Sequence, residues 1–284
     1  KGILLFLGNS DAAVNYPGNQ YRFRQDSNFN YFFGLTDPDL AAIIDVESGE
    51  EIIFGNDVDI DDIIWMGPQP LLKEKALKCG VDKTLPLAYL SAALGRGREI
   101  HYLPPYRYHN MIRLHKLLGI PFEQMKERAS LTFIKGVVSL RIIKEECEIA
   151  EIEKACDIGY LMHYTAMKQM RCGMIEQDLV GIMEGISISK GLMPSFPIIL
   201  SQNGETLHNH SHHQILTEGR LVVIDAGAET NSNYTSDFTR TLPPSGKFTQ
   251  QQKEIYTIVS NANNLAISLA RPGVSYTEVH QAAS

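Results

Sequence analysis

The chain has 284 residues, 44% of them hydrophobic, so it is long enough to bury a core, and its length favours two domains. Its 26 basic and 33 acidic residues give a net charge of -7 without a basic cluster, which argues against a nucleic-acid or anionic-membrane surface. No apolar run reaches the roughly 18 residues of a membrane-spanning helix. The four cysteines lack CxxC spacing, so we expect free thiols and a cytoplasmic protein.

The first part of the chain alternates strand-like and helix-like segments, which is typical of an α/β domain. Ser48-Gly49-Glu50 separates two apolar runs, and its glycine allows the positive φ angle of a tight hairpin. After Gly119-Ile120-Pro121 the composition becomes helical, so we predict domains at residues 1–125 and 126–284. The expected strands of the first domain cover 3–7, 41–46, 51–54 and 99–103, and its expected helices cover 71–79 and 108–118.

Two helices and a second hairpin are expected next. One helix starts at Glu148 and the other ends before Pro194, because proline breaks the helical pattern. Strands follow at 198–200, 221–224 and 234–241, and the last two are joined by the polar turn Thr230 to Asn233. Residues at helical spacing predict one packed face for each helix: Ile149, Ile152, Cys156, Gly159 and Tyr160 in the first, and Leu179, Ile182, Met183 and Ile186 in the second.

A third helix is expected after Gly246, where Thr249 and Gln252 have the spacing of a capping box. The helix would end at Arg271-Pro272-Gly273. Six residues at helical spacing would be buried: Ile255, Ile258, Val259, Ala262, Leu265 and Leu269.

The chain contains an internal repeat. Arg171-Cys172-Gly173, with Asp178-Leu179 after it, matches Arg271-Pro272-Gly273, with Glu278-Val279 at the same offsets. Each copy follows one long helix and opens another, so we expect a duplicated helix-helix-hairpin unit whose second copy is incomplete at Ser284.

Two aspartates are candidate metal ligands. Asp225 directly follows the apolar run 221–224, and Asp237 lies in the strand that the hairpin brings opposite. A partly buried carboxylate needs a cation, hydrogen bonds or a proton, and two such groups side by side suit a divalent metal. An ion pair with Arg240 is the simpler alternative on spacing alone.

A histidine-rich stretch, His208-Asn209-His210-Ser211-His212-His213, precedes the hairpin. A strand period of two would place His208, His210 and His212 on one face, where they could bind metal or transfer protons. Such runs are also typical of exposed loops, which is our interpretation for His212 and His213. His208 follows Leu207 at the end of a strand-like stretch, so we expect it at the rim of a cleft.

The combination of motifs resembles the aminopeptidase P family, a branch of the pita-bread metallopeptidases that include prolidase and creatinase. The run from Tyr21 to Leu35, YRFRQDSNFNYFFGL, is similar to the signature of that family's amino-terminal domain. Three further motifs follow in family order: Trp65-Met66-Gly67; Leu140 to Lys144 with Glu148-Ile149-Ala150; and Asp225-Ala226-Gly227 with Ser236 to Thr241. His208 also precedes Asp225 by the interval that is usual in the family.

The resemblance implies an α/β amino-terminal domain followed by an α+β pita-bread domain, here incomplete at its C-terminus. It implies two divalent ions, commonly manganese, with Asp225 chelating one ion and Asp237 bridging both. A metal-bound hydroxide would hydrolyse the bond between an N-terminal residue and a following proline, and His208 would assist the intermediate. The family also implies a homodimer or a larger homo-oligomer.

The chain departs from the family in two places. The aspartates are twelve positions apart, one more than is usual, and the turn can absorb the extra residue; Glu145-Glu146-Cys147 stands where relatives often carry Ser-Pro. The family's remaining ligands, one His and two Glu, and its second catalytic His would lie beyond Ser284, so we expect the polypeptide alone to be inactive. A non-catalytic peptide- or protein-binding pita-bread module and a prolidase-type dipeptidase remain the alternatives.

Overall fold

The computed structural model describes residues 1–95 and 97–284, which divide into two compact units, residues 1–143 and 144–284. The division falls later than the predicted domain boundary after residue 125. The reason is helix α6 (Leu131–Arg141), which packs Phe133 and Val137 into the core of the first unit. Helical composition alone does not assign a helix to a domain, because packing against the sheet decides its place.

The first unit is built on a five-stranded mixed sheet, four of whose strands lie where the sequence predicts them. The strand at residues 83–85 was not predicted. The hairpin of β4 and β5 turns through Gly49, whose φ of 71° confirms the need for glycine. In spatial order, the strands are β6 (Lys83–Leu85), β5 (Glu51–Phe54), β4 (Ala41–Asp45), β1 (Ile3–Leu7) and β7 (Ile100–Tyr102).

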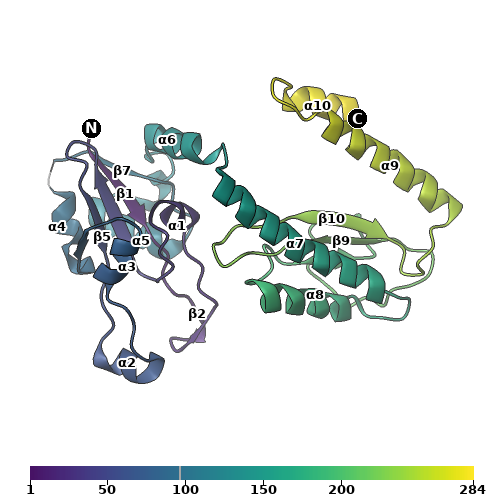
Figure 1. The fold of residues 1–284 in the computed structure, drawn as a ribbon, viewed down its shortest axis with the longest axis horizontal. Helices are drawn as coiled ribbons and strands as arrows, with labels where there is room; N and C mark the ends of the chain where they lie inside the picture. Colours follow the sequence, from purple (N-terminus) through teal and green to yellow (C-terminus); the bar gives the residue numbers. More distant parts are fainter. Residues whose placement is uncertain (96) are drawn as a thin grey trace. The chain divides into compact units, whose positions relative to one another are not determined.

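Helices cover both faces of this sheet (Figure 1). Alternate residues of each strand face opposite sides, so Ile3 and Leu5 join one core while Phe6 joins the other. On the first face lie α4 (Leu90–Leu94) and α5 (Tyr108–Leu118); on the second lie α1 (Ser27–Phe33), α3 (Leu72–Lys78) and α6. The short elements are β2 (Ala13–Tyr16), β3 (Asn19–Gln20), α2 (Ile60–Met66), η1 (Leu87–Tyr89) and η2 (Phe122–Gln124).

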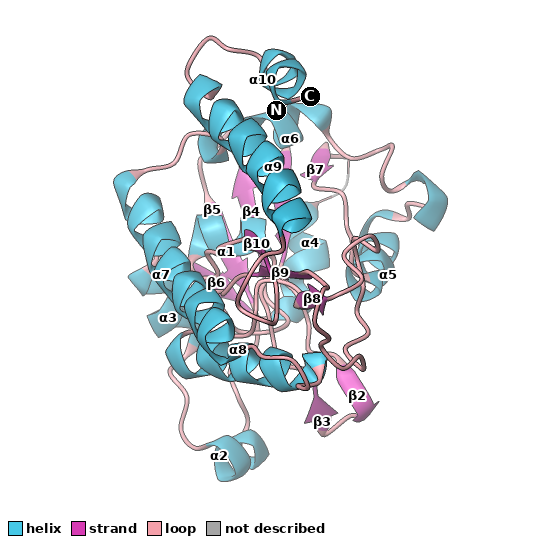
Figure 2. Ribbon diagram, turned by 90° about the vertical axis from the view of Figure 1, so that its right-hand side faces the viewer, coloured by secondary structure: helices cyan, strands magenta, loops and turns pink. Residues whose placement is uncertain are grey.

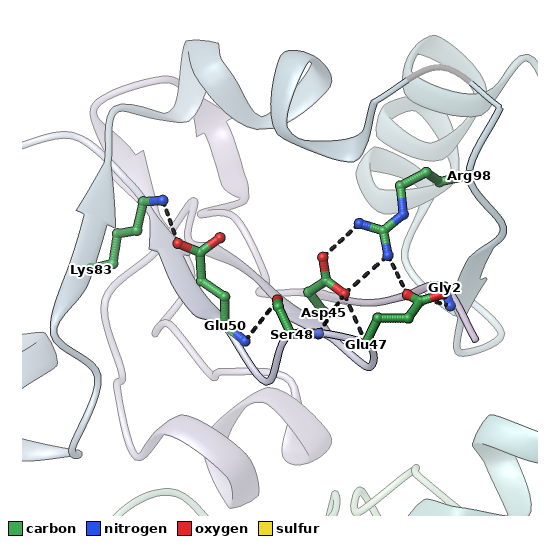
Figure 3. Close-up of polar contacts among 7 residues, drawn as sticks. All are labelled: Gly2, Asp45, Glu47, Ser48, Glu50, Lys83 and Arg98. Carbon is green, nitrogen blue, oxygen red and sulfur yellow. Dashed lines mark hydrogen bonds and ion pairs between the residues drawn. The ribbon is translucent and has the colours of Figure 1, made fainter.

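An ion-pair cluster ties together the strand ends at one edge of the first unit (Figure 3). Arg98 Nη1 and Nη2 donate to the two carboxylate oxygens of Asp45 at 2.5 and 3.0 Å, and Arg98 also pairs with Glu47. Because β1 lies between β4 and β7, Arg98 links the end of β4 to the segment that enters β7. The Arg98 hydrogen bonds hold the pKa of Asp45 well below its usual range.

Arg98→Gln is expected to make the first unit less sensitive to acid. A carboxyl with a lowered folded pKa stabilises the fold above its unfolded pKa of about 4, and this contribution is lost as the pH falls through the folded value. The variant should return the Asp45 pKa towards its ordinary value and reduce the stability lost below about pH 4. NMR titration of Asp45, with urea unfolding at two pH values, measures both effects. As a control, Lys83→Gln removes the Lys83–Glu50 ion pair and should leave the Asp45 pKa unchanged. If Asp45 has the same pKa in the wild type and in Arg98→Gln, the prediction is wrong.

The second unit packs two antiparallel helices against a three-stranded antiparallel sheet. The helices α7 (Glu146–Gln169) and α8 (Glu176–Lys190) lie side by side in Figure 1 and in Figure 2. The sheet has the order β10 (Phe238–Leu242), β9 (Val222–Ala226) and β8 (Ile199–Ser201). The core joins these layers through buried residues of α7, α8 and the strands. The predicted helices and strands are confirmed, although β10 starts at Phe238 and not at 234.

The packed face of α7 differs from the predicted one. Ile149 and Tyr160 are 46% and 65% exposed, whereas Gly159 is buried as predicted, and Ala155 and His163 are buried with it. The buried residues do recur at the predicted three- and four-residue spacing. The residues that pack closely against the sheet, however, include small residues and a histidine. This stripe on α7 is the one that contacts the second hairpin.

The internal repeat is visible in the backbone. Gly173 and Gly273 have φ angles of 91° and 90°, and each turn is followed by a helix, α8 or α10 (Tyr276–Ala283). Asp178 and Glu278 accept hydrogen bonds from the backbone N–H groups that precede these helices. Both turns therefore begin a helix in the same way, one hundred positions apart.

Helix α9 (Gln250–Leu269) begins with the predicted capping box at Thr249, but its predicted buried face is wrong. Ile258 and Val259 are 65% and 63% exposed, and α9 contains no buried residue. Its main neighbour among the described residues is α10. An amphipathic pattern shows which face can be packed, whereas the neighbours that a fold supplies decide whether it is packed.

Within residues 1–95 and 97–284, none of the helices has both the length and the apolar content that crossing a bilayer requires. The four cysteines are free thiols, as expected.

Candidate metal centre

The two aspartates lie on one face of the second hairpin. Asp225 is in β9 opposite Thr239, and Asp237 is two positions before Thr239. Alternate residues of a strand share a face, so Asp225 and Asp237 are diagonal neighbours across the strand pair. The two strands are joined by a turn at Thr230 to Asn233, in which the Thr230 N–H donates to the Tyr234 carbonyl and Asn233 has a φ of 65°.

The carboxylates interact electrostatically. Partial burial, with the negative charge and side-chain contact of Asp225, raises the pKa of Asp237. A carboxyl whose pKa is raised binds its proton more tightly in the folded state. Stability of the second unit therefore falls as the pH rises through that value, unless a cation compensates the pair.

A divalent cation fits this pair. Asp225 Oδ1 is buried and has no hydrogen-bond partner among the described residues. A buried acceptor without a partner destabilises the fold, and a bound cation would offset that cost. Carboxylate oxygens are the ligands that Mn²⁺, Mg²⁺ and Ca²⁺ prefer. In the part of the chain that the structure describes, no third His, Cys, Asp or Glu completes a cluster. Asp225 and Asp237 would hold a cation, but with few ligands.

Helix α7 holds the hairpin along several turns. Tyr234 Oη donates to Glu148 Oε1 at 2.6 Å, and Ser236 Oγ donates to the Ala155 carbonyl at 2.7 Å. At Gly159 an added Cβ would lie 2.7 Å from Ser236 Oγ, so only glycine allows this approach. The residue before Asp237 is therefore fixed from the helix side.

His163 contacts the residues that follow both aspartates. It is 4% exposed, its Nε2 lies 3.1 Å from the Ala226 carbonyl oxygen, and its ring meets that of Phe238 edge-on at 6.2 Å. Burial, with the positive charge of Arg240, lowers the pKa of His163. His163 was not among the predicted site residues, because its contacts are with strands that lie far from it in the chain.

His208 lies in the loop between β8 and β9 and is exposed. The described contacts do not bring it to the aspartates, and its role stays a prediction. The loop interpretation suits its neighbours: His213 is exposed, while His212 is partly buried with Nδ1 3.1 Å from the Leu200 carbonyl oxygen. The Gln177 N–H also donates to the His212 carbonyl, so α8 anchors the end of this loop.

Arg240 does not neutralise the aspartates. Among the described residues it forms no ion pair with either of them; its Nη1 donates to the Thr239 carbonyl at 2.7 Å, and its guanidinium lies over the Phe238 ring. The simpler alternative to a metal therefore has no support in this geometry.

Comparisons with known proteins agree with this picture. Residues 1–99 match the family "Aminopeptidase P, N-terminal domain", and residues 150–284 match "Metallopeptidase family M24". The chain is 32% identical over 276 residues to the Xaa-Pro aminopeptidase of Escherichia coli, covering 92% of this chain and 62% of the relative. It is 30% identical over 285 residues to a probable Xaa-Pro aminopeptidase of Fusarium vanettenii, covering 99% of this chain and 60% of that relative. The chain thus spans about three fifths of the curated relatives it matches.

Solved structures share the fold. Aminopeptidase P from Escherichia coli in its low-pH form aligns with a TM-score of 0.87 at 27% identity, covering 99% of this chain and 67% of that one. The Pseudomonas aeruginosa aminopeptidase PepP aligns with a TM-score of 0.86 at 23% identity, covering 99% and 66%. These likenesses confirm the α/β amino-terminal domain followed by a pita-bread domain. The chain belongs to the aminopeptidase P family of the M24 metallopeptidases.

Proposed function

We propose that this protein is a metalloaminopeptidase that hydrolyses the bond between an N-terminal residue and a following proline. The observation that carries the proposal is the Asp225–Asp237 pair on a hairpin that α7 holds in place. Asp225 Oδ1 in this pair is buried and has no hydrogen-bond partner among the described residues. Curated relatives of the chain are named Xaa-Pro aminopeptidase or probable Xaa-Pro aminopeptidase, which supports the same substrate class. A proline-containing peptide is therefore the proposed substrate.

Asp225 and Asp237 would hold two divalent ions, for which manganese is the proposed identity. When bound, such cations supply Lewis acidity towards the scissile carbonyl and the attacking water. Both aspartates would serve as ligands, Asp225 from within β9 and Asp237 from the more exposed edge of the hairpin. The exposed His208, in the loop between β8 and β9, would donate a hydrogen bond to the oxyanion that forms on the substrate.

The polypeptide of residues 1–284 is proposed to have little activity by itself. The described residues place two carboxylates together without a third ligand, and metal affinity falls steeply as ligands are lost. We also propose that the protein forms a homodimer or a larger homo-oligomer and that it is located in the cytoplasm.

The first test combines intact mass with activity. Native protein is purified, its mass is compared with 31.8 kDa, and Mn²⁺-dependent release of the first residue from an Xaa-Pro-containing tripeptide is measured. Activity in a heavier chain that disappears in Asp237→Ala supports the peptidase. Cleavage of Xaa-Pro dipeptides but not longer peptides would indicate a prolidase instead. A metal-loaded heavier chain that cleaves neither substrate would indicate a binding module, and activity at 31.8 kDa would overturn the proposed inactivity of residues 1–284.

A further inference from the structure

A single buried histidine connects α7 to both arms of the metal-centre hairpin. His163 lies four positions after Gly159 and eight after Ala155, on the stripe of α7 that faces the hairpin. Its Nε2 is 3.1 Å from the carbonyl oxygen of Ala226, the residue after Asp225. Its ring packs against Phe238, the residue after Asp237.

The geometry fixes the tautomer of His163. A carbonyl oxygen only accepts, so Nε2 must carry the proton and donate to Ala226. The second ring nitrogen, Nδ1, is buried and has no hydrogen-bond partner among the described residues. Burial also lowers the pKa of His163, so the neutral form with hydrogen on Nε2 is the one that the surroundings stabilise.

The two contacts act on the spacing of the carboxylates. Ala226 and Phe238 are directly paired across β9 and β10. His163 donates a hydrogen bond to Ala226 and packs its ring against Phe238. These contacts hold β9 and β10 against α7 at the positions next to Asp225 and Asp237. Gly159 and Ser236 already fix the other side of Asp237, so His163 supplies the matching restraint beside Asp225.

We propose that His163 is a positioning residue for the metal centre: through the Ala226 carbonyl and the Phe238 ring, it sets the geometry in which Asp225 and Asp237 bind divalent cations. This inference rests on the proposed function. His163 is not proposed as a ligand, because among the described residues no third His, Cys, Asp or Glu forms a metal-binding cluster with Asp225 and Asp237.

The first test compares Mn²⁺ binding by three variants of the native protein, purified as for the activity test and measured as free Mn²⁺ by electron paramagnetic resonance. His163→Leu removes the donor and should weaken Mn²⁺ binding by about tenfold, the lower end of the effect of losing an outer-shell partner. His163→Gln retains an N–H donor near the position of Nε2 and should restore most of the affinity. Met162→Ala is the control, because Met162 is a neighbouring buried residue whose side chain has no hydrogen-bond donor: it should lower the unfolding midpoint while changing Mn²⁺ affinity by less than about twofold.

The second test is independent of metal. Two-bond ¹H–¹⁵N correlation spectra of the metal-free chain should show a neutral His163 with its proton on Nε2. A proton on Nδ1 with a bare Nε2 would overturn the inference even if the metal site is real.

The outcomes separate the two proposals. If the wild type binds no Mn²⁺, the proposed function fails at its metal site and the positioning role falls with it. If the wild type binds Mn²⁺ and His163→Leu binds it equally well, only the positioning role is overturned. If His163→Leu does not fold, equal affinity in His163→Gln and wild type supports the inference, and a tenfold loss in a folded His163→Gln contradicts it.

Discussion

Asp225→Asn should weaken Mn²⁺ binding by at least about a hundredfold, because losing a ligand exceeds the 10–100-fold effect of losing an outer-shell partner. Asp225 Oδ1 is buried without a hydrogen-bond partner among the described residues, so a cation is the natural group to compensate it. The amide has the shape of the carboxylate but lacks its charge. Mn²⁺ titration followed by electron paramagnetic resonance measures the loss.

The same substitution should not weaken the fold. In metal-free protein at neutral pH, Asp225→Asn removes the negative charge that raises the pKa of Asp237. The variant should therefore unfold at an equal or higher urea concentration, and its stability should depend less on pH above pH 4, roughly the ordinary carboxyl pKa.

Asp157→Asn is the matched control, since Asp157 is exposed on α7 and its replacement changes the net charge equally. It should leave Mn²⁺ binding and the Asp237 pKa nearly unchanged. Equal loss of Mn²⁺ affinity in both variants would mean that binding reflects overall charge, and the metal site would have to be placed elsewhere.

Gly227→Ala should destabilise the second unit by about 3 kcal/mol, the upper part of the range for overpacked sites. A Cβ on Gly227 would lie 1.7 Å from the Ser236 carbonyl oxygen and 2.8 Å from Ser195 Oγ. The first of these atoms belongs to the backbone, so the strands must separate to accept the methyl group. Because they separate between Asp225 and Asp237, Mn²⁺ affinity should fall together with stability.

Gly185→Ala tests whether steric crowding, and not glycine as such, causes that loss. Gly185 lies in the exposed face of α8, and an added Cβ meets nothing within 4 Å. This variant should be about 0.5–1 kcal/mol more stable than the wild type, because alanine favours the helix. Amide exchange in β9 and β10 measures both variants, since the chain's one tryptophan, Trp65, lies in the first unit. A Gly227→Ala protein as stable as the wild type would contradict the close approach.

Much of the fold could be predicted because local signals suffice for it. The strand pairs on either side of Gly49 and of Thr230 to Asn233 follow from apolar runs that flank turn residues. The capping box at Thr249 follows from a side chain that bonds to its own helix end. The motifs around Asp225 and Asp237 identified the family and the candidate ligands before any geometry was known.

Packing had to be decided by the tertiary structure. The sequence could not assign α6 to the first unit, place Ala155 and His163 in the packed stripe of α7, or show that Val259 remains exposed. It also could not reveal His163, whose importance depends on a carbonyl 63 positions away. The physical reason is the same in each instance: a period or a turn is set by neighbours in the chain, whereas burial and side-chain contacts are set by whichever distant surface folding brings alongside.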